Sequence, residues 1–393
     1  MGMAMIEQVV IIVGAGPSGL ATSACLKNLC IPNVVIERDD CSASLWKKRC
    51  YDRLNLHLGK EFCELPHFPF PPDAPTFISK IDFIKYIDDY STRFGVEPLF
   101  SREVIEATYD REVQRWILHV TNTCTKNVEC YSGRFLVVAT GENSVGIIPE
   151  IPGLPDFEGE VLHSSQFKSG RTHSGQNVLV VGCGNSGMEI ALDLSIHGAD
   201  ASIVVRNPIH VMNKELIHMG MRLLRYFPLG LVDRLMVACS QWLYGNTSQF
   251  GIRRPEEGPF LLKRKTGRSP ILDQGTFNKI KSGDIKVLPA IAHIRGKEVD
   301  FSNGEKKVFD AIILATGYKS AIKAWLKDEE EIFNEDGMPR AKYPNHWRGL
   351  NGLYCAGLSR RGLFGVSEDA MNIANDIYSL FRDGLNSERG LRH

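Results

Sequence analysis

Two stretches of the chain repeat one glycine spacing, G-x-G-x-x-G, at residues 14–19 and 182–187. In such a turn the first glycine permits a tight bend, the second lets a pyrophosphate approach the backbone, and the third lets the next helix pack closely. The phosphates then lie on unpaired N–H groups at the positive end of the helix dipole. We therefore predict two dinucleotide-binding turns. Their residues are Gly14, Ala15, Gly16, Pro17, Ser18 and Gly19 in the first turn, and Gly182, Cys183, Gly184, Asn185, Ser186 and Gly187 in the second.

The sequence around each turn supports this interpretation, which a lone glycine pattern would not carry. Residues 7–13 and 177–181 are apolar runs rich in β-branched side chains, which is typical of buried parallel strands. Each run leads into its turn, and a helix is expected after each turn, to about residue 29 and to about residue 196. Both copies thus show the strand–turn–helix order that a nucleotide site needs.

The residue at the end of the second strand in each copy indicates which nucleotide binds. In the first copy it is Glu37, whose carboxylate suits the ribose hydroxyls of FAD or NAD. In the second copy it is Arg206, whose guanidinium suits the 2′-phosphate of NADPH. A solvated strand-end cation is the alternative for Arg206. One acidic and one basic site are most simply interpreted as FAD plus NADPH.

Later strands extend both copies and predict the fold. Residues 134–139 and 310–315 are apolar strands, and a short strand at 353–356 precedes a last helix over about 367–381. The first two strands run into four further cofactor-binding candidates, Thr140, Gly141, Thr316 and Gly317. We predict an α/β fold with two Rossmann-like dinucleotide-binding domains, in which the NADPH domain is inserted into the FAD domain. The expected ranges are 1–150 and 310–393 for FAD, and 151–309 for NADPH, with a helical insertion at about 208–275.

Composition excludes several other classes of protein. The 393 residues hold 46 Lys and Arg against 46 Asp and Glu, so no surplus charge indicates nucleic acid or an acidic membrane surface. No stretch approaches the ~20 apolar residues of a membrane helix, and residues 221–244 read as an amphipathic helical segment. Residues 1–8 are too short and polar for a signal peptide. Ten scattered cysteines fit a reduced, cytoplasmic protein.

Metal and dithiol chemistry are not indicated. The eleven histidines lack H-E-x-x-H spacing and no C-x-x-C occurs, so no metal site is predicted. Cys25 and Cys30 have the C-x-x-x-x-C spacing of dithiol flavoprotein reductases. However, both are expected on the helix after the first turn, where this spacing points them to different sides. We interpret them as small buried hydrophobes.

Two further motifs carry a resemblance to a known family. Residues 157–168 match the fingerprint F-x-G-x-x-x-H-x-x-x-[FY]-[KD] of flavin-containing monooxygenases, with His163 at its histidine. Residues 314–318 look like a second motif of that family. The resemblance implies a flavin-dependent monooxygenase. In such an enzyme the cofactor carries the chemistry, so no catalytic triad or acid–base carboxylate pair is required.

A closer resemblance covers almost the whole chain. Residues 46–58, 60–66, 266–273 and 359–365 resemble stretches of the plant YUCCA flavin monooxygenases. That family uses FAD, NADPH and O₂ to convert indole-3-pyruvate, a 2-oxo acid, to indole-3-acetate, the growth hormone auxin. By the same comparison Trp46 is a cofactor-binding candidate. His57 lies where many relatives place an asparagine near the flavin, which makes it the catalytic candidate.

The chain departs from its relatives at a few positions, and other functions stay open. Ala43 and Ser44 replace a glycine pair of animal relatives, and Asn55 stands where most YUCCA members have lysine. The alternatives are N- or S-oxygenation of another small substrate, a FAD/NADPH reductase without oxygen insertion, and a nucleotide-binding regulator without turnover. Residues 208–275 offer aromatic and basic side chains for a keto acid, but none is assigned. Nothing indicates the oligomeric state.

Overall fold

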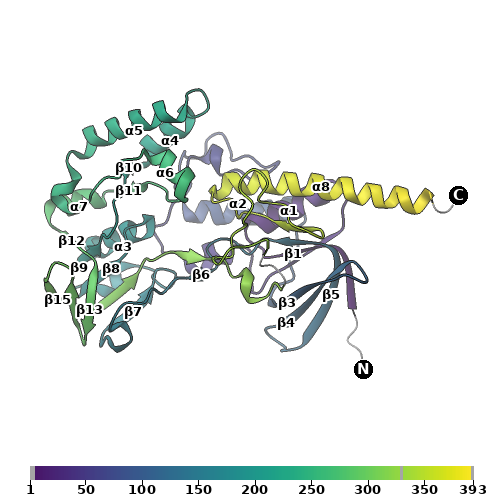
Figure 1. Ribbon diagram of the computed structural model, residues 1–393, viewed down its shortest axis with the longest axis horizontal. Coiled ribbons are helices and arrows are strands. Elements are labelled where there is room, and N and C mark those ends of the chain that lie inside the picture. Colours follow the sequence, from purple (N-terminus) through teal and green to yellow (C-terminus); the bar gives the residue numbers. More distant parts are fainter. Residues whose placement is uncertain (1–4, 328–330, 391–393) are drawn as a thin grey trace. The chain divides into compact units, whose positions relative to one another are not determined.

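The computed structural model describes residues 5–327 and 331–390, with side chains up to residue 383 (Figure 1). Of the predicted N-terminal segment 1–8, the first four residues lie outside this range. The chain forms two compact units. The first unit comprises Met1–Lys48, Gly59–Val145 and Tyr318–His393, and the second comprises Arg49–Leu58 and Gly146–Gly317. Each unit is built on its own sheet.

The first unit carries a sheet of order β2-β1-β5-β4-β3. Strand β1 lies between β2 and β5 and is parallel to both. On its other edge β5 pairs antiparallel with β4 through its first half, and parallel with β18 through its last residues. The strands are β1 (Met5–Val13), β2 (Asn33–Ile36), β3 (Arg102–Asp110), β4 (Arg115–Asn122), β5 (Val128–Val138) and β18 (Leu353–Cys355). The closing strand therefore completes the first sheet, as predicted.

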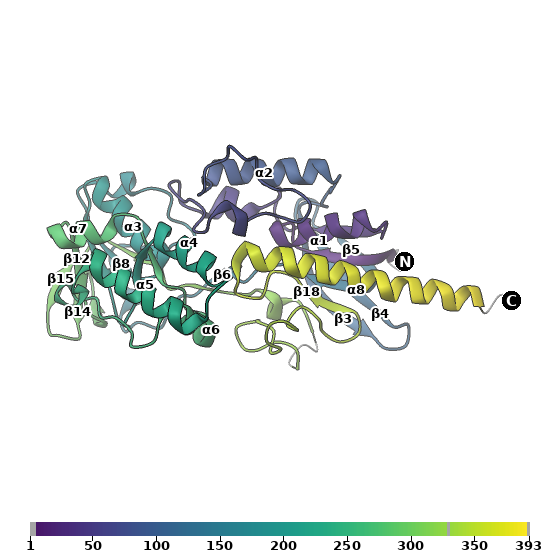
Figure 2. The same cartoon turned by 90° about the horizontal axis from the view of Figure 1, so that it is seen from above.

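The α-helices that the structure describes in the first unit are α1 (Pro17–Asn28), α2 (Lys80–Arg93) and α8 (Gly362–Gly390). Helices α1 and α8 pack side by side although they come from opposite ends of the chain (Figure 2). The middle of β1, residues 10–12, is fully buried, which explains its unbroken run of β-branched side chains.

The second unit has a fully parallel sheet of order β12-β9-β8-β16-β7. Its strands are β7 (Glu160–His163), β8 (Asn177–Val181), β9 (Asp200–Val204), β12 (Ile285–Leu288) and β16 (Ala311–Leu314), with helices α3 (Asn185–Ile196) and α7 (Thr276–Ser282). Between β9 and α7 the chain forms β10 (Val211–Asn213), α4 (Lys214–Leu223), α5 (Leu229–Tyr244), α6 (Pro259–Thr266) and β11 (Ile271–Asp273). An antiparallel sheet of β13 (Ile291–Arg295), β14 (Glu298–Phe301) and β15 (Lys306–Val308) follows.

The predicted α/β fold with two Rossmann-like sheets is confirmed. Short strands β6 (Val145–Gly146) and β17 (Tyr318–Lys319) lie where the chain passes from one unit to the other. None of the helices that the structure describes combines the length and apolarity needed to cross a membrane.

Some sequence-based expectations need correction. The segment 221–244 is not one helix, because α4 ends at Leu223 and α5 begins only after Pro228. Helix α8 begins at Gly362, five residues before the expected start. Cys30 does not lie on α1: it follows the end of that helix with φ of 56° and is exposed, whereas Cys25 is buried. The positions of the two cysteines therefore argue against a redox pair more strongly than the sequence did.

Candidate functional site

The first glycine turn joins β1 to α1. Gly14 has φ of 108°, and a Cβ there would lie 2.5 Å from the carbonyl oxygen of Ala139. A Cβ on Gly19 would overlap the carbonyl oxygen of Gly14, so only glycine fits at both positions. By contrast, nothing lies within 4 Å of the Cβ position of Gly16, the residue before α1. Its backbone borders open space, as an approaching pyrophosphate requires.

The second turn, between β8 and α3, repeats this geometry. Gly182 also has φ of 108°, and its Cβ would lie 2.5 Å from the carbonyl oxygen of Ala315. A Cβ on Gly187 would overlap the carbonyl oxygen of Gly182, whereas Gly184 has nothing within 4 Å. Two turns far apart in the chain thus place their second glycine against open space. Each precedes a helix N-terminus with unpaired N–H groups, which is a ready anion site.

A cavity of about 530 Å³ opens beside the first turn, entirely within the first unit. The predicted residues that line it are Gly14, Gly16, Pro17, Ser18, Glu37, Trp46, Thr140 and Gly141. Ala15 and Gly19 are not among its lining residues: Ala15 donates its N–H to Glu37, and Gly19 packs against Gly14. Residues that the sequence did not indicate also line the cavity, among them Arg102, Asn143, Trp325 and Gly357. Gly357 follows β18 with φ of 75°.

Two polar side chains show that this cavity suits a nucleotide cofactor. The Thr140 hydroxyl is buried and has no hydrogen-bond partner among the described residues, which leaves it for a bound group. Glu37 is buried and accepts hydrogen bonds from the N–H groups of Ala15 at 2.7 Å and Asp39 at 2.9 Å. Burial raises the pKa of the Glu37 carboxyl. A carboxylate can accept more than two hydrogen bonds, so ribose hydroxyls can complete its set.

Arg206 lies two residues beyond the end of β9 in the second unit. Its side chain is exposed and makes no hydrogen bond or ion pair with any other residue that the structure describes. A guanidinium held at a strand end without a protein partner is available for a phosphate.

His57 lies in the second unit, against the first turn of α3. The amide of Asn185 accepts a hydrogen bond from the Leu272 N–H at 2.9 Å and turns its NH₂ to His57 Nδ1 at 3.2 Å. Nδ1 is therefore an acceptor, and the ring proton is on Nε2. Nε2 donates to Glu189 at 2.8 Å. These contacts support a role for His57 in positioning Asn185, and they do not test its predicted catalytic role.

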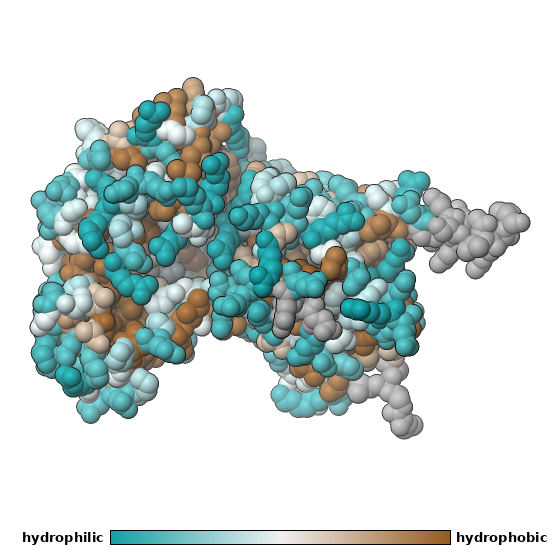
Figure 3. All heavy atoms as spheres, in the orientation of Figure 1, coloured by the Kyte–Doolittle hydropathy of each residue, from teal (hydrophilic) through white to brown (hydrophobic). Residues whose placement is uncertain are grey.

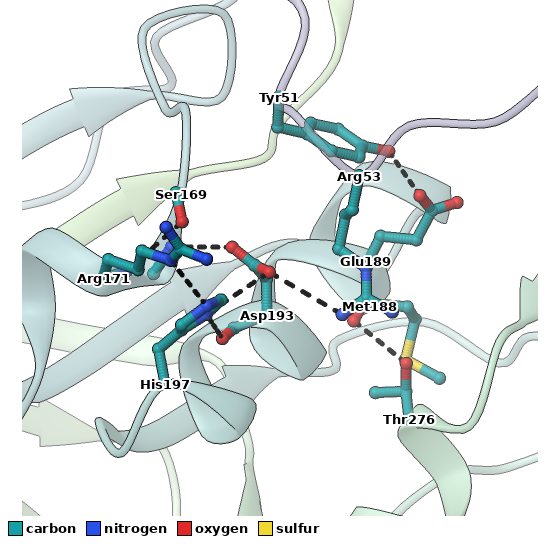
Figure 4. Close-up of polar contacts among 10 residues, drawn as sticks. Tyr51, Arg53, Ser169, Arg171, Met188, Glu189, Asp193, His197 and Thr276 are labelled. Atoms are coloured by element: carbon teal, nitrogen blue, oxygen red, sulfur yellow. Dashed lines mark hydrogen bonds and ion pairs between the residues drawn. The ribbon is translucent and has the colours of Figure 1, made fainter. Parts of the chain in front are cut away.

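Glu189 is the centre of this network and is fully buried. Besides His57, its carboxyl accepts hydrogen bonds from the Tyr51 hydroxyl at 2.9 Å and from Gln274 Nε2 at 2.8 Å. One turn further along α3, Asp193 lies 3.7 Å from Arg53 (Figure 4). Residues 49–58 are thus fastened along α3 by two of its acidic side chains, which no sequence motif indicated.

The remaining predicted cofactor-binding residues of the second unit form part of the protein's own structure. The Ser186 side chain hydrogen-bonds Tyr51, and burial raises the pKa of the Cys183 thiol to about 12, which keeps it neutral. The Thr316 hydroxyl donates to the carbonyl of Ile147, and Gly317 has φ of 91°. These residues shape the turn and the end of β16.

The fingerprint histidine, His163, is buried at the end of β7. Its ring contacts the Ser165 hydroxyl at 2.9 Å and the Gly317 carbonyl at 3.2 Å. Burial lowers the pKa of His163, so the ring is neutral near pH 7. It therefore fastens the fingerprint segment to the end of β16 by hydrogen bonds.

Among the side chains that the structure describes, no group of three or more His, Cys, Asp or Glu could hold a metal ion. The ten cysteines are all unpaired. The two glycine turns, each following a strand that lies between two parallel neighbours, define the class of oxidoreductases that bind two dinucleotides.

Comparison with known proteins specifies the family. Residues 7–334 match the family model "Flavin-binding monooxygenase-like". The probable indole-3-pyruvate monooxygenase YUCCA10 of Arabidopsis thaliana is 51% identical over 375 residues, which cover 95% of this chain and 98% of that protein. Indole-3-pyruvate monooxygenase YUCCA1 of Oryza sativa subsp. japonica is 48% identical over 378 residues, 95% and 92% of the two chains. The chain belongs to the flavin-binding monooxygenases and, among them, to the YUCCA family.

Solved structures show the same fold at low identity. A flavin-containing monooxygenase from Stenotrophomonas maltophilia has a TM-score of 0.72 at 17% identity, with 96% of this chain and 99% of that chain covered. A complex of OTEMO with FAD and NADP has a TM-score of 0.73 at 16% identity, with 97% and 86% covered. The likeness to these structures concerns the fold alone.

Proposed function

We propose that this protein is an NADPH-dependent flavin monooxygenase that converts indole-3-pyruvate to indole-3-acetate in auxin biosynthesis. The observation that carries the proposal is 51% identity to a probable indole-3-pyruvate monooxygenase across nearly the full length of both chains. The balanced reaction consumes the keto acid, O₂, NADPH and a proton. It yields indole-3-acetate, CO₂, NADP⁺ and water.

The first unit would hold FAD. Gly14, Gly16 and the N–H groups at the start of α1 would face its pyrophosphate, and Glu37 would accept its ribose hydroxyls. Trp46 and the unpartnered Thr140 hydroxyl border the same cavity. When bound, the flavin supplies both the acceptance of hydride from NADPH and the activation of O₂.

The second unit would hold NADPH. Gly182 and Gly184 at the start of α3 would face the pyrophosphate, and Arg206 the 2′-phosphate. We assign residues 151–309 to the NADPH domain, and 1–150 with 310–393 to the FAD domain. The division into two compact units supports this assignment at its boundaries near residues 146 and 317, whereas residues 49–58 of the proposed FAD range pack with the second unit. The His57–Asn185 contact would hold the amide at the entrance of the turn.

We also propose a cytoplasmic location. The support is chemical: all ten cysteines are unpaired, as in a compartment that keeps thiols reduced.

A substrate panel tests the function. Purified enzyme with NADPH and air is given indole-3-pyruvate, phenylpyruvate, a thioether and a tertiary amine, and products are identified by mass spectrometry. We expect NADPH oxidation coupled to release of CO₂ from indole-3-pyruvate. A sulfoxide or N-oxide as the only product would contradict the proposed substrate. NADPH oxidation with no oxygenated product would contradict the monooxygenase reaction itself.

A further inference from the structure

Helix α5 exposes an apolar face to solvent. Leu231, Leu235, Ala238 and Trp242 are all exposed, and their spacing of four, three and four residues places them on one side of the helix. We call these four residues the α5 apolar face. Trp242 is 84% exposed, the largest value among the large hydrophobic side chains of the described chain. Exposed Tyr226 and Phe227 precede the helix in the turn from α4. Figure 3 shows apolar and hydrophilic residues interleaved over the end of the molecule where α4 and α5 lie.

The opposite side of α5 is fully packed, so the helix does not need this face for its fold. Val232, Met236, Ser240 and Tyr244 are buried beneath it. The buried Asp233 carboxyl accepts hydrogen bonds from the N–H groups of Phe260 and Leu261, which caps helix α6. The α5 apolar face is thus presented on a well-anchored helix. An isolated exposed leucine is ordinary, but a stripe ending in an exposed tryptophan marks a contact surface.

The segment that contains α5 also carries an excess of positive charge. Residues 214–268 contain ten Lys and Arg against four Asp and Glu, an excess of six in a chain whose 46 basic and 46 acidic residues otherwise balance. The balanced total of the whole chain thus includes a local basic region at residues 214–268. Arg234 lies on α5 between Leu231 and Leu235, and its guanidinium donates a hydrogen bond to the Gly230 carbonyl of the same helix. Arg222 and Arg225 are exposed beside Tyr226.

We propose that the α5 apolar face docks on the surface of a lipid bilayer that contains anionic lipids. A helix with leucines and a tryptophan on one side and arginines beside them lies in the plane of the interface, with its apolar side at the acyl boundary. The arginines reach the anionic headgroups while their aliphatic stems cover apolar surface. A second copy of this chain is a poorer occupant, because pairing the same face would bring two basic regions together.

Vesicle sedimentation with the FAD-loaded full chain tests this. The vesicles contain phosphatidylcholine with or without about a third phosphatidylserine. We expect binding to the anionic vesicles that falls about tenfold or more at high salt or without phosphatidylserine. A blue shift of tryptophan emission should accompany binding and vanish in Trp242→Phe, although the chain has four other tryptophans.

A triple variant and a matched control decide the outcome. The variant Leu231→Gln, Leu235→Gln, Trp242→Gln should lose vesicle affinity by at least about tenfold, with NADPH oxidation unchanged. The control Ile81→Gln, which removes a side chain that is 76% exposed elsewhere, should bind like the unaltered protein. Equal binding by the triple variant would overturn the proposal. So would no binding by the unaltered protein together with a concentration-dependent dimer that the triple variant abolishes.

Discussion

Arg206 is the residue on which the choice of nicotinamide nucleotide depends in this proposal. It is exposed and unpartnered among the described residues, so substitution should leave the fold intact. We predict that Arg206→Ser raises the dissociation constant of NADP⁺ about 10- to 100-fold, since a hydrogen bond to a charged group contributes about 1.5–3 kcal/mol. Affinity for NAD⁺ should stay the same. Equilibrium titration of the FAD-loaded enzyme measures both.

Arg295→Ser is the matched control for this substitution. Arg295 is an exposed arginine of the same unit that pairs with Asp300 at 2.9 Å on the separate antiparallel sheet. Its loss should change neither affinity. If Arg206→Ser weakened NADP⁺ and NAD⁺ equally, Arg206 would not read the 2′-phosphate.

Glu189 makes a second prediction possible at this scale. Its buried carboxyl faces three donors, from Tyr51, His57 and Gln274. In Glu189→Gln an amide NH₂ replaces one acceptor oxygen, so either the Tyr51 hydroxyl must turn to accept from it or the His57 and Gln274 donors lose their acceptor. We predict a loss of about 1–3 kcal/mol in unfolding free energy, seen as a lower melting temperature. Glu160→Gln, at a half-exposed glutamate of the same unit, should have little effect. Equal melting temperatures for the two variants would contradict the network.

The kinetics of a His57 variant can distinguish a positioning role from a catalytic role for this residue. If the ring only positions Asn185, His57→Ala should raise the KM for NADPH several-fold and leave kcat nearly unchanged. Enzyme-bound FAD should also be unchanged, because the contacts of His57 lie in the second unit. A fall of kcat by about 100-fold or more with an unchanged KM would instead support the predicted catalytic role.

At the scale of elements, each glycine turn contains one glycine that the fold requires and another that a bound nucleotide requires. Gly187 has no room for a Cβ, whereas Gly184 faces open space. We therefore predict that Gly184→Ala folds, keeps its FAD and loses NADP⁺ affinity at least about tenfold. Gly187→Ala should fail to fold or lose stability severely. Gly16→Ala, the same change in the first turn, should fold and lose FAD instead.

Flavin absorbance of the purified protein and NADP⁺ titration measure these effects. Gly230→Ala is the control, because Gly230 also has open space around its Cβ position but lies outside both turns. Unaltered NADP⁺ affinity in Gly184→Ala would contradict the assignment of the second turn.

Sequence patterns predicted these elements well where the backbone is buried in a regular way. The unbroken β-branched runs at β1 and β8 and the glycine spacings located both turns, because burial on two faces and a close backbone approach leave few alternatives. The break between α4 and α5 was missed, since the amphipathic pattern continues across Pro228. The packing of residues 49–58 on α3 rests on single polar contacts far apart in sequence, which have no periodic signal.

At the scale of the whole molecule, one nucleotide-binding plan occurs twice, with the second copy inside the first. Most of the candidate cofactor residues could be predicted from the sequence, because each nucleotide-binding domain has a fixed order of strand, turn, helix and strand-end residue. The cavity residues Arg102 and Trp325 could not be predicted from the sequence, because the fold brings them to the cavity from distant parts of the chain. The substrate cannot be read from such a plan, and its assignment depends on identity to relatives.

The central claim is oxygen insertion into the keto acid, and isotopically labelled O₂ tests it most directly. Enzyme, NADPH and indole-3-pyruvate are combined under labelled O₂ with excess catalase, because free H₂O₂ also decarboxylates 2-oxo acids. The account predicts indole-3-acetate with one labelled carboxylate oxygen and one NADPH consumed for each product molecule. Oxidation of NADPH with no labelled indole-3-acetate once catalase is present would contradict it.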